Sequence, residues 1–123
     1  MKYNAKLQGE IEKFKEYVII VEGKKDVQAL KSLGFDRVYA IHSTGVSIRE
    51  RVEQIMPFIT RKDRVCILSD LDRKGKQLYE KLKPIFQEFG AKLDSTLRGI
   101  LIKSRVSHIE GLSTFMGKID QIE

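Results

Sequence analysis

The sequence has little cysteine, proline or tryptophan: its 123 residues include one cysteine, two prolines and no tryptophan. The single cysteine, Cys66, excludes an internal disulfide and a cysteine-rich zinc site. Because it lies inside the apolar run 65–68, we expect a buried thiol in a reducing compartment. With so few prolines and no Gly/Ser-rich stretch, no linker divides the chain, and we expect one domain.

Long hydrophobic segments are also missing. The longest apolar stretch, residues 17–21, is far shorter than the roughly 20 residues that cross a bilayer. The first six residues are followed by alternating charges and not by the apolar core of a signal peptide. We therefore predict a cytoplasmic protein with no membrane partner.

Basic residues outnumber acidic ones, with 23 Lys and Arg against 17 Asp and Glu and a net charge of +6. This balance favours an anionic partner such as nucleic acid. A Lys- and Glu-rich surface of the kind that heat-adapted proteins carry would give the same composition without any partner. Charge alone therefore leaves the function open.

Hydrophobic patterning predicts an α/β fold with a central, mostly parallel four-stranded sheet flanked by helices. Short apolar runs typical of buried parallel strands occupy 18–21, 37–42 and 65–68, and a fourth strand is expected around 100–103. Helices are expected over 1–16, over 25–33 and after Ser47. A further helix is expected after the third strand, ending at Gly90, and a short one after Ser107. We expect an N-terminal helix over 1–14 that packs on the domain, the main α/β unit over 15–103, and a C-terminal helical extension over 104–123.

Carboxylates follow two of the predicted strands. Glu22 comes directly after the first strand, and Asp70 and Asp72 come after the third. Ligands of open parallel sheets bind beyond the carboxyl ends of the strands, so these side chains converge if the two strands are neighbours. Converging carboxylates repel one another unless a cation intervenes, and Mg²⁺ prefers oxygen ligands. Alternatively, Asp72 serves only as a helix N-cap and Glu22 belongs to a simple turn.

The same residues resemble the two motifs of the Toprim domain. The first motif is a strand ending in Glu-Gly with an aspartate three residues after the glycine, here Glu22, Gly23 and Asp26. The second is a strand ending in Asp-X-Asp followed by a glycine, here Asp70, Asp72 and Gly75. The resemblance covers roughly residues 15–103 and is closest to the small stand-alone Toprim proteins of archaea and bacteria. Primases, topoisomerases and the ribonuclease that matures 5S ribosomal RNA share this domain.

The resemblance implies a Toprim (Rossmann-like) fold and Mg²⁺-dependent phosphodiester chemistry, with Mn²⁺ as a possible substitute. It implies that Asp70 and Asp72 hold the ion or ions, and that Glu22 acts as general acid/base and can join the metal shell. It also implies that Gly23 and Gly75 allow close approach of the backbone. The chain has no room for the tyrosine-bearing domain of topoisomerases, and one cysteine cannot supply the zinc module of primases.

Basic residues near the motifs are candidates for contacts with nucleic-acid phosphates, although a solvated helix start would carry the same residues. They are Lys24, Lys25, Arg73, Lys74, Lys76, Lys103 and Arg105. The last two and His108 are included because they would follow the predicted fourth strand at the same edge of the sheet. His42, which ends the second predicted strand, is a further candidate.

Three hypotheses stay open. The first is a nuclease or related phosphotransferase that acts on RNA or DNA. The second is a non-catalytic nucleic-acid-binding or assembly subunit with a structural metal site, which works with a protein partner or a second copy of the chain. The third, a phosphatase or phospho-receiver, is weaker because Arg73 follows the Asp-X-Asp motif, where haloacid-dehalogenase phosphatases carry Thr or Val.

Overall fold

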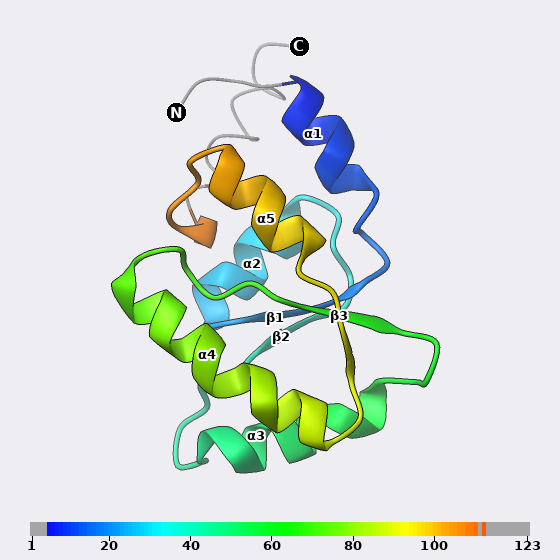
Figure 1. The fold of residues 1–123 in the computed structure, drawn as a ribbon, viewed down its shortest axis with the longest axis vertical. Helices are drawn as coiled ribbons and strands as arrows, with labels where there is room; N and C mark the ends of the chain where they lie inside the picture. Colours follow the sequence, from blue (N-terminus) through cyan, green and yellow to red (C-terminus); the bar gives the residue numbers. More distant parts are fainter. Residues whose placement is uncertain (1–4, 111, 113–123) are drawn as a thin grey trace.

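The computed structural model describes residues 5–110 and residue 112 (Figure 1). Within these residues, four strands form one sheet in the order β2-β1-β3-β4, and every neighbouring pair is parallel. The strands are β1 (Val18–Val21), β2 (Val38–Ala40), β3 (Arg64–Ile67) and β4 (Lys92–Leu93). The predicted α/β fold with a four-stranded sheet is therefore confirmed.

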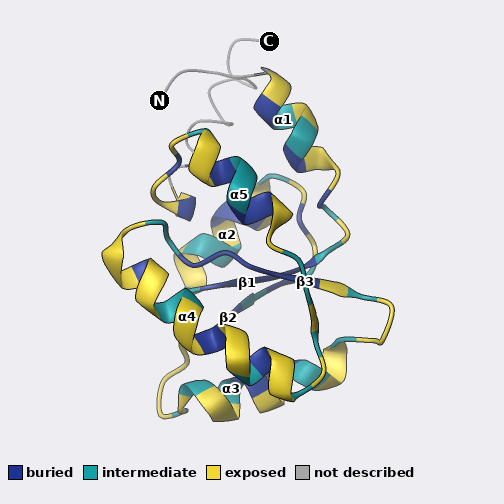
Figure 2. Cartoon of the chain, in the orientation of Figure 1, coloured by how far each residue is buried: buried dark blue, intermediate teal, exposed yellow. Residues whose placement is uncertain are grey.

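Helices cover both faces of the sheet (Figure 1). On one side lie α1 (Ala5–Glu12), α2 (Lys24–Ser32) and α5 (Thr96–Lys103). On the other side lie α3 (Ile48–Ile55), which continues into the short 3₁₀-helix η1 (Met56–Phe58), and α4 (Arg73–Glu88). Figure 2 shows the consequence: β1 and most of β3 are buried, and the exposed residues lie mainly on the outer faces of the helices and in the loops.

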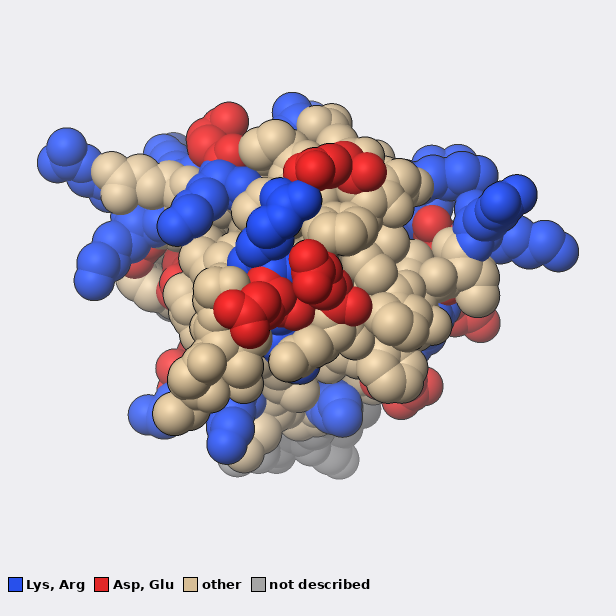
Figure 3. Space-filling view, turned by 90° about the horizontal axis from the view of Figure 1, so that it is seen from below, with Lys and Arg blue, Asp and Glu red and all other residues tan. Residues whose placement is uncertain are grey.

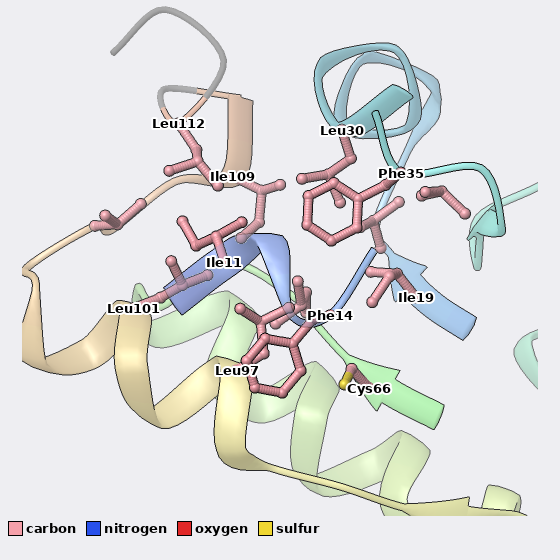
Figure 4. Close-up of a cluster of buried hydrophobic side chains, with 14 of the residues drawn as sticks. Ile11, Phe14, Ile19, Leu30, Phe35, Cys66, Leu97, Leu101, Ile109 and Leu112 are labelled. Carbon is pink, nitrogen blue, oxygen red and sulfur yellow. The ribbon is translucent and has the colours of Figure 1, made fainter. Parts of the chain in front are cut away.

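Each face of the sheet has its own apolar cluster, and β1 contributes to both because its side chains alternate. Ile19 and Val21 pack with α1, α2 and α5, whereas Val18 and Ile20 pack with α3 and α4. Figure 4 shows the first cluster, in which Cys66 lies among apolar side chains. The expected burial of Cys66 is therefore confirmed, and this burial raises the pKa of the thiol to about 12.

The prediction of a strand around residues 100–103 is wrong. These residues form the second half of α5, in which Leu97 and Leu101 lie one helical turn apart and are both buried. The fourth strand is β4, which pairs with the edge of β3. It escaped sequence reasoning because it is two residues long, half exposed and contains a lysine. Lys103 and Arg105 consequently do not follow a strand.

The predicted helices are present with shifted ends. The first covers Ala5–Glu12 and not 1–16, and residues 1–4 lie outside the described part. Helix α4 begins directly at Arg73 and continues through Pro84. Residues 109 and 110 are helical, in agreement with the helix predicted after Ser107, while residue 111 and residues 113–123 of the predicted extension lie outside the described part. No helix of the described residues is long and apolar enough to span a membrane.

Candidate metal centre

The strand order creates a crevice between β1 and β3. From β1 the chain continues to β2 on one side, whereas β3 lies on the other side and leads on to β4. Such a reversal of strand order separates the following loops, and ligands of parallel sheets bind at this point. Glu22 follows β1 and Asp70 follows β3, so the two acidic motifs lie on the two sides of the crevice. This edge of the sheet is at the left in Figure 1.

Glu22 and Asp70 are joined directly. The Oε2 atom of Glu22 accepts a hydrogen bond of 2.7 Å from the backbone N–H of Asp70. The side chain of Asp70 is held in turn, because its Oδ1 atom accepts a hydrogen bond of 3.0 Å from the backbone N–H of Ile109. The predicted convergence of the two motifs is therefore present, and the segment after α5 completes the site.

Asp72 has two contacts. Its Oδ1 atom accepts a hydrogen bond of 2.8 Å from the N–H of Gly75 and caps α4, as the simpler interpretation expected. Its Oδ2 atom lies 3.4 Å from Nε2 of His108. Capping thus uses one carboxylate oxygen and leaves the other at the crevice. His108 reaches the site from the loop after α5 and not from the predicted fourth strand.

The side chains of Asp70, Asp72 and His108 form a group that could hold a metal ion. One ligand atom from each lies within 4.8 Å of the others, and Glu22 stands beside them through its bond to Asp70. Two carboxylates suit Mg²⁺, which binds oxygen ligands and keeps several waters. The imidazole of His108 adds a nitrogen donor that suits Mn²⁺ and later transition metals better than Mg²⁺. The chemistry of the donors therefore fits a divalent cation.

Gly75 has a steric reason to be glycine. A Cβ atom at this position would overlap the backbone carbonyl of Asp70. The first turn of α4 therefore packs directly on the acidic loop, and the Oγ atom of Ser69 donates a hydrogen bond of 2.6 Å to the Gly75 carbonyl. Gly23 differs, since a Cβ there would meet no atom within 4 Å. Within the protein, close approach of the backbone is therefore seen at Gly75, and Gly23 borders open space.

Arg98 is a residue of the site that sequence reasoning missed. Although charged, it is only 6% exposed. Its Nη1 atom donates to the carbonyl of Ser69 at 2.6 Å, and its guanidinium lies 4.4 Å from the ring centroid of Tyr79. Its Nη2 atom lies 3.4 Å from the carbonyl of Asp70. Burial lowers the pKa of Arg98. An arginine inside the apolar stretch 97–102 was the available signal, and the incorrect strand assignment obscured it.

Asp26 also belongs to the negatively charged region around the crevice. Its pKa is raised, chiefly by burial and then by the charges of Asp70 and Glu22. A hydrogen bond of 3.1 Å from the backbone N–H of Gly23 to its Oδ2 atom opposes this shift. Asp26 is the aspartate of the first motif, and it adds a carboxylate in the first turn of α2 to those of Glu22 and Asp70.

The basic candidates divide into two groups. Lys24, Lys25, Arg73 and Lys74 lie in the first turns of α2 and α4, beside the crevice. Lys76 lines a hollow between α4 and α5 with Arg98 and Tyr79. Lys103 ends α5 and lines a hollow beside α1, so its predicted position at the crevice is wrong. Arg105 lies in the turn after α5. Figure 3 shows lysine and arginine side chains at both ends of the molecule, so net charge alone does not locate a binding site.

Comparisons with known proteins agree with this architecture. The Toprim domain family matches residues 17–104. A UPF0292 protein of Methanocaldococcus jannaschii is 31% identical over 125 residues, which cover 94% of each chain. A UPF0292 protein of Methanosarcina barkeri is 33% identical over 107 residues, 83% of this chain and 71% of the relative.

A solved structure has the same fold. It is described as a putative protein from Aquifex aeolicus, and it superposes with a TM-score of 0.71 and 28% identity over 90% of this chain and 99% of the other. The family match spans both acidic motifs and the sheet that carries them. The chain therefore belongs to the Toprim domain family, and within it to the small stand-alone UPF0292 proteins.

Proposed function

We propose that this protein binds Mg²⁺ through Asp70 and Asp72 and uses it to cleave or transfer phosphodiester bonds of nucleic acid, with Glu22 as general acid/base. Toprim domains typically bind Mg²⁺ and often act on nucleic acid. The observation that supports the proposal most is the hydrogen bond between Glu22 and the backbone of Asp70, because it brings the two motifs together in one crevice.

Each carboxylate suits a separate task in this proposal. Asp70 and Asp72 lie on one loop, and each has one carboxylate oxygen held by a backbone N–H. The second oxygen of each side chain takes no part in these bonds and would bind a cation in the crevice. Bound there, Mg²⁺ would supply positive charge for the phosphate oxygens and for the leaving oxygen.

Glu22 would move the proton in this proposal. It is half-buried and lines a hollow of about 390 Å³ together with His42 and Lys74. One of its oxygens accepts the hydrogen bond from Asp70, which fixes the side chain. In this proposal the nucleotide would enter this hollow, where the neighbouring lysine suits a phosphate. A positioned carboxylate of this kind typically contributes about 10²–10⁴-fold to a rate.

A second candidate function is a metal-holding subunit without turnover. The observation that favours it is that both aspartates already stabilise the fold: Asp72 caps α4, and Asp70 accepts from Ile109. A cation could then serve only to join the loop after β3 to the segment after α5. With this second function, the protein would bind nucleic acid and metal but would not cleave the phosphodiester bond.

Cleavage of labelled RNAs and DNAs with Mg²⁺, Mn²⁺ or chelator separates the two candidates. The wild type is compared with Glu22→Gln and Asp70→Asn, and with Asp36→Asn as a control at an exposed aspartate before β2. We expect metal-dependent cleavage that is lost in the first two variants and kept in the control. Metal binding with no cleavage of any substrate would favour the metal-holding subunit. Equal cleavage by all four proteins would exclude Glu22 as general acid/base and Asp70 as a ligand of the catalytic metal.

A further inference from the structure

A large hollow of the described surface lies beside the crevice and not inside it. It measures about 800 Å³ and runs along β2, the edge strand of the sheet, between α2 and α3. Its walls are the backbone and side chains of β2, the start of α2 and the loop after β2. We call it the β2 groove. The Toprim motifs contribute no carboxylate to it.

The open edge of β2 is partly blocked by an arginine. Because Arg37 and Ile41 bond to β1, the intervening peptide groups of Val38 and Ala40 point away from the sheet, into the β2 groove. The Nε atom of Arg51, from α3, donates to the outward carbonyl of Ala40 at 2.8 Å. A three-residue edge with an occupied acceptor is a poor template for an added strand.

The residues that line the β2 groove suit an anion. They include the cations Lys24 and Arg51 and the polar side chains of Gln28, Ser43 and Thr44, and none of the described lining residues is acidic. Tyr39 adds an aromatic ring, which stacks on the exposed Phe58 with centroids 5.9 Å apart. Cations along a groove with an aromatic surface are typical of sites for single-stranded nucleic acid.

The β2 groove adjoins the hollow that Glu22 lines. His42, in the loop after β2, lines both the β2 groove and the hollow that contains Glu22. That second hollow carries Lys74 and Lys81 on its far side, and Glu22 is its one acidic residue among those described. Cations thus lie on both sides of Glu22, and His42 stands where the two hollows meet.

We propose that the β2 groove binds the phosphate backbone of a nucleic-acid single strand and leads it past His42 to Glu22. This proposal rests on the proposed function, since it adds a path for the substrate to that site. Lys24 and Arg51 hold phosphates on the β2 side, and Lys74 and Lys81 hold them on the α4 side. A second copy of the chain adding a strand to β2 is the competing occupant, which the blocked carbonyl of Ala40 disfavours.

Binding without turnover tests the path separately from catalysis. Fluorescence anisotropy with labelled single-stranded RNA and DNA oligonucleotides is measured in chelator over a series of salt concentrations. One variant removes two groove cations, Lys24→Gln with Arg51→Gln. A second, Thr44→Glu, places a negative charge in the groove at an exposed loop position. The matched control, Arg61→Gln with Lys62→Gln, removes two exposed cations that precede the amino end of β3, away from the residues that line the groove.

We expect the double groove variant to raise the dissociation constant about tenfold and to lower the salt slope by about 0.7 for each lost contact. Thr44→Glu should weaken binding as well, and the control should bind like the wild type. Melting temperatures show whether each variant is folded. Because chelator prevents metal-dependent cleavage, the experiment measures binding alone. A protein that never cleaves can still bind through the groove, and a protein that cleaves can show no effect of the groove variants.

Three results would overturn the proposal. The first is groove variants that are folded and bind no worse than the control. The second is a wild type that binds neither RNA nor DNA. The third is a wild-type dimer in sedimentation that Thr44→Glu dissociates without any change in oligonucleotide affinity, which would assign the β2 edge to a second copy.

Discussion

The carboxylate of Glu22 accepts a hydrogen bond of 2.7 Å from the backbone N–H of Asp70, although the two residues are 48 positions apart in the chain. The bond crosses from the loop after β1 to the loop after β3. It joins the two acidic motifs into one structural unit. A substitution of Glu22 should therefore change the position of the loop that carries Asp70 and Asp72. The predictions below separate this structural role from the chemical one.

Replacing Glu22 by Gln should separate acid/base chemistry from loop geometry. The amide oxygen can still accept from Asp70, so we expect near wild-type stability and metal binding, with a rate lower by about 10²–10⁴-fold. Glu22→Ala should also destabilise the fold by about 1–3 kcal/mol, because the N–H of Asp70 loses its partner. Thermal unfolding and single-turnover cleavage measure the two effects. A fully active Glu22→Gln variant would contradict the assigned role.

Replacing Arg98 by Met should weaken metal binding without touching a ligand. Arg98 holds the carbonyl of Ser69, next to Asp70, and we expect a loss of about 10–100-fold in Mg²⁺ affinity, as for other groups that orient ligands. Arg98→Lys should restore part of the loss. Val52→Ala, a cavity in the opposite apolar cluster, is the control for destabilisation alone. If both variants lose stability and neither loses affinity, Arg98 is only a structural residue.

His108 should influence which metal binds. Its imidazole lies beside Asp72, and nitrogen ligands favour Mn²⁺ over Mg²⁺. We therefore expect His108→Ala to reduce the affinity for Mn²⁺ by about tenfold while the affinity for Mg²⁺ changes little. Calorimetric titration with each metal gives both values. An equal loss for the two metals would indicate that His108 positions Asp72 and does not bind the ion.

Asp26 should make the metal-free protein less stable as the pH rises. Its folded pKa is raised by burial and by the charges of Asp70 and Glu22, so its contribution to stability is full at low pH and is lost as the pH rises through the folded pKa. In chelator, Asp26→Asn should therefore melt at a higher temperature than the wild type at neutral pH.

The gain from Asp26→Asn should disappear below the ordinary aspartate value of 3.8. It should also shrink in saturating Mg²⁺, because a bound cation offsets the negative charge of the crevice. Melting curves across this pH range, with and without Mg²⁺, measure both effects. A gain that is independent of pH would show that the charge of Asp26 is not its cause.

The parts of the fold that sequence patterns could predict are those with strong local signals. Runs such as 18–21 and 65–68 are wholly apolar because both faces of their strands are buried, and the carboxylates that follow them mark the edge of the sheet. β4 has no such run, and the apolar segment 100–103 fits a buried helix as well as a strand. The predicted fourth strand therefore fell on α5, and β4 was not predicted.

The residues of the site that sequence patterns missed depend on contacts that no local pattern encodes. Arg98 lies 28 positions after Asp70, and its role follows only from its burial under the loop and over Tyr79. His108 was named for a strand end that does not exist, yet it reaches Asp72 through the loop after α5. The β2 groove is formed by α2, β2 and α3 together. Tertiary packing, and not motif spacing, determines these three features.

The central claim is that the carboxylates of Asp70 and Asp72, after β3, form a divalent-cation site beside Glu22. Calorimetric titration of Mg²⁺ into the wild type, Asp70→Asn and the exposed control Asp36→Asn tests it most directly. The account predicts that Asp70→Asn loses about tenfold or more in affinity while the control binds like the wild type. Equal affinities for all three proteins, or no binding to the wild type, would contradict it.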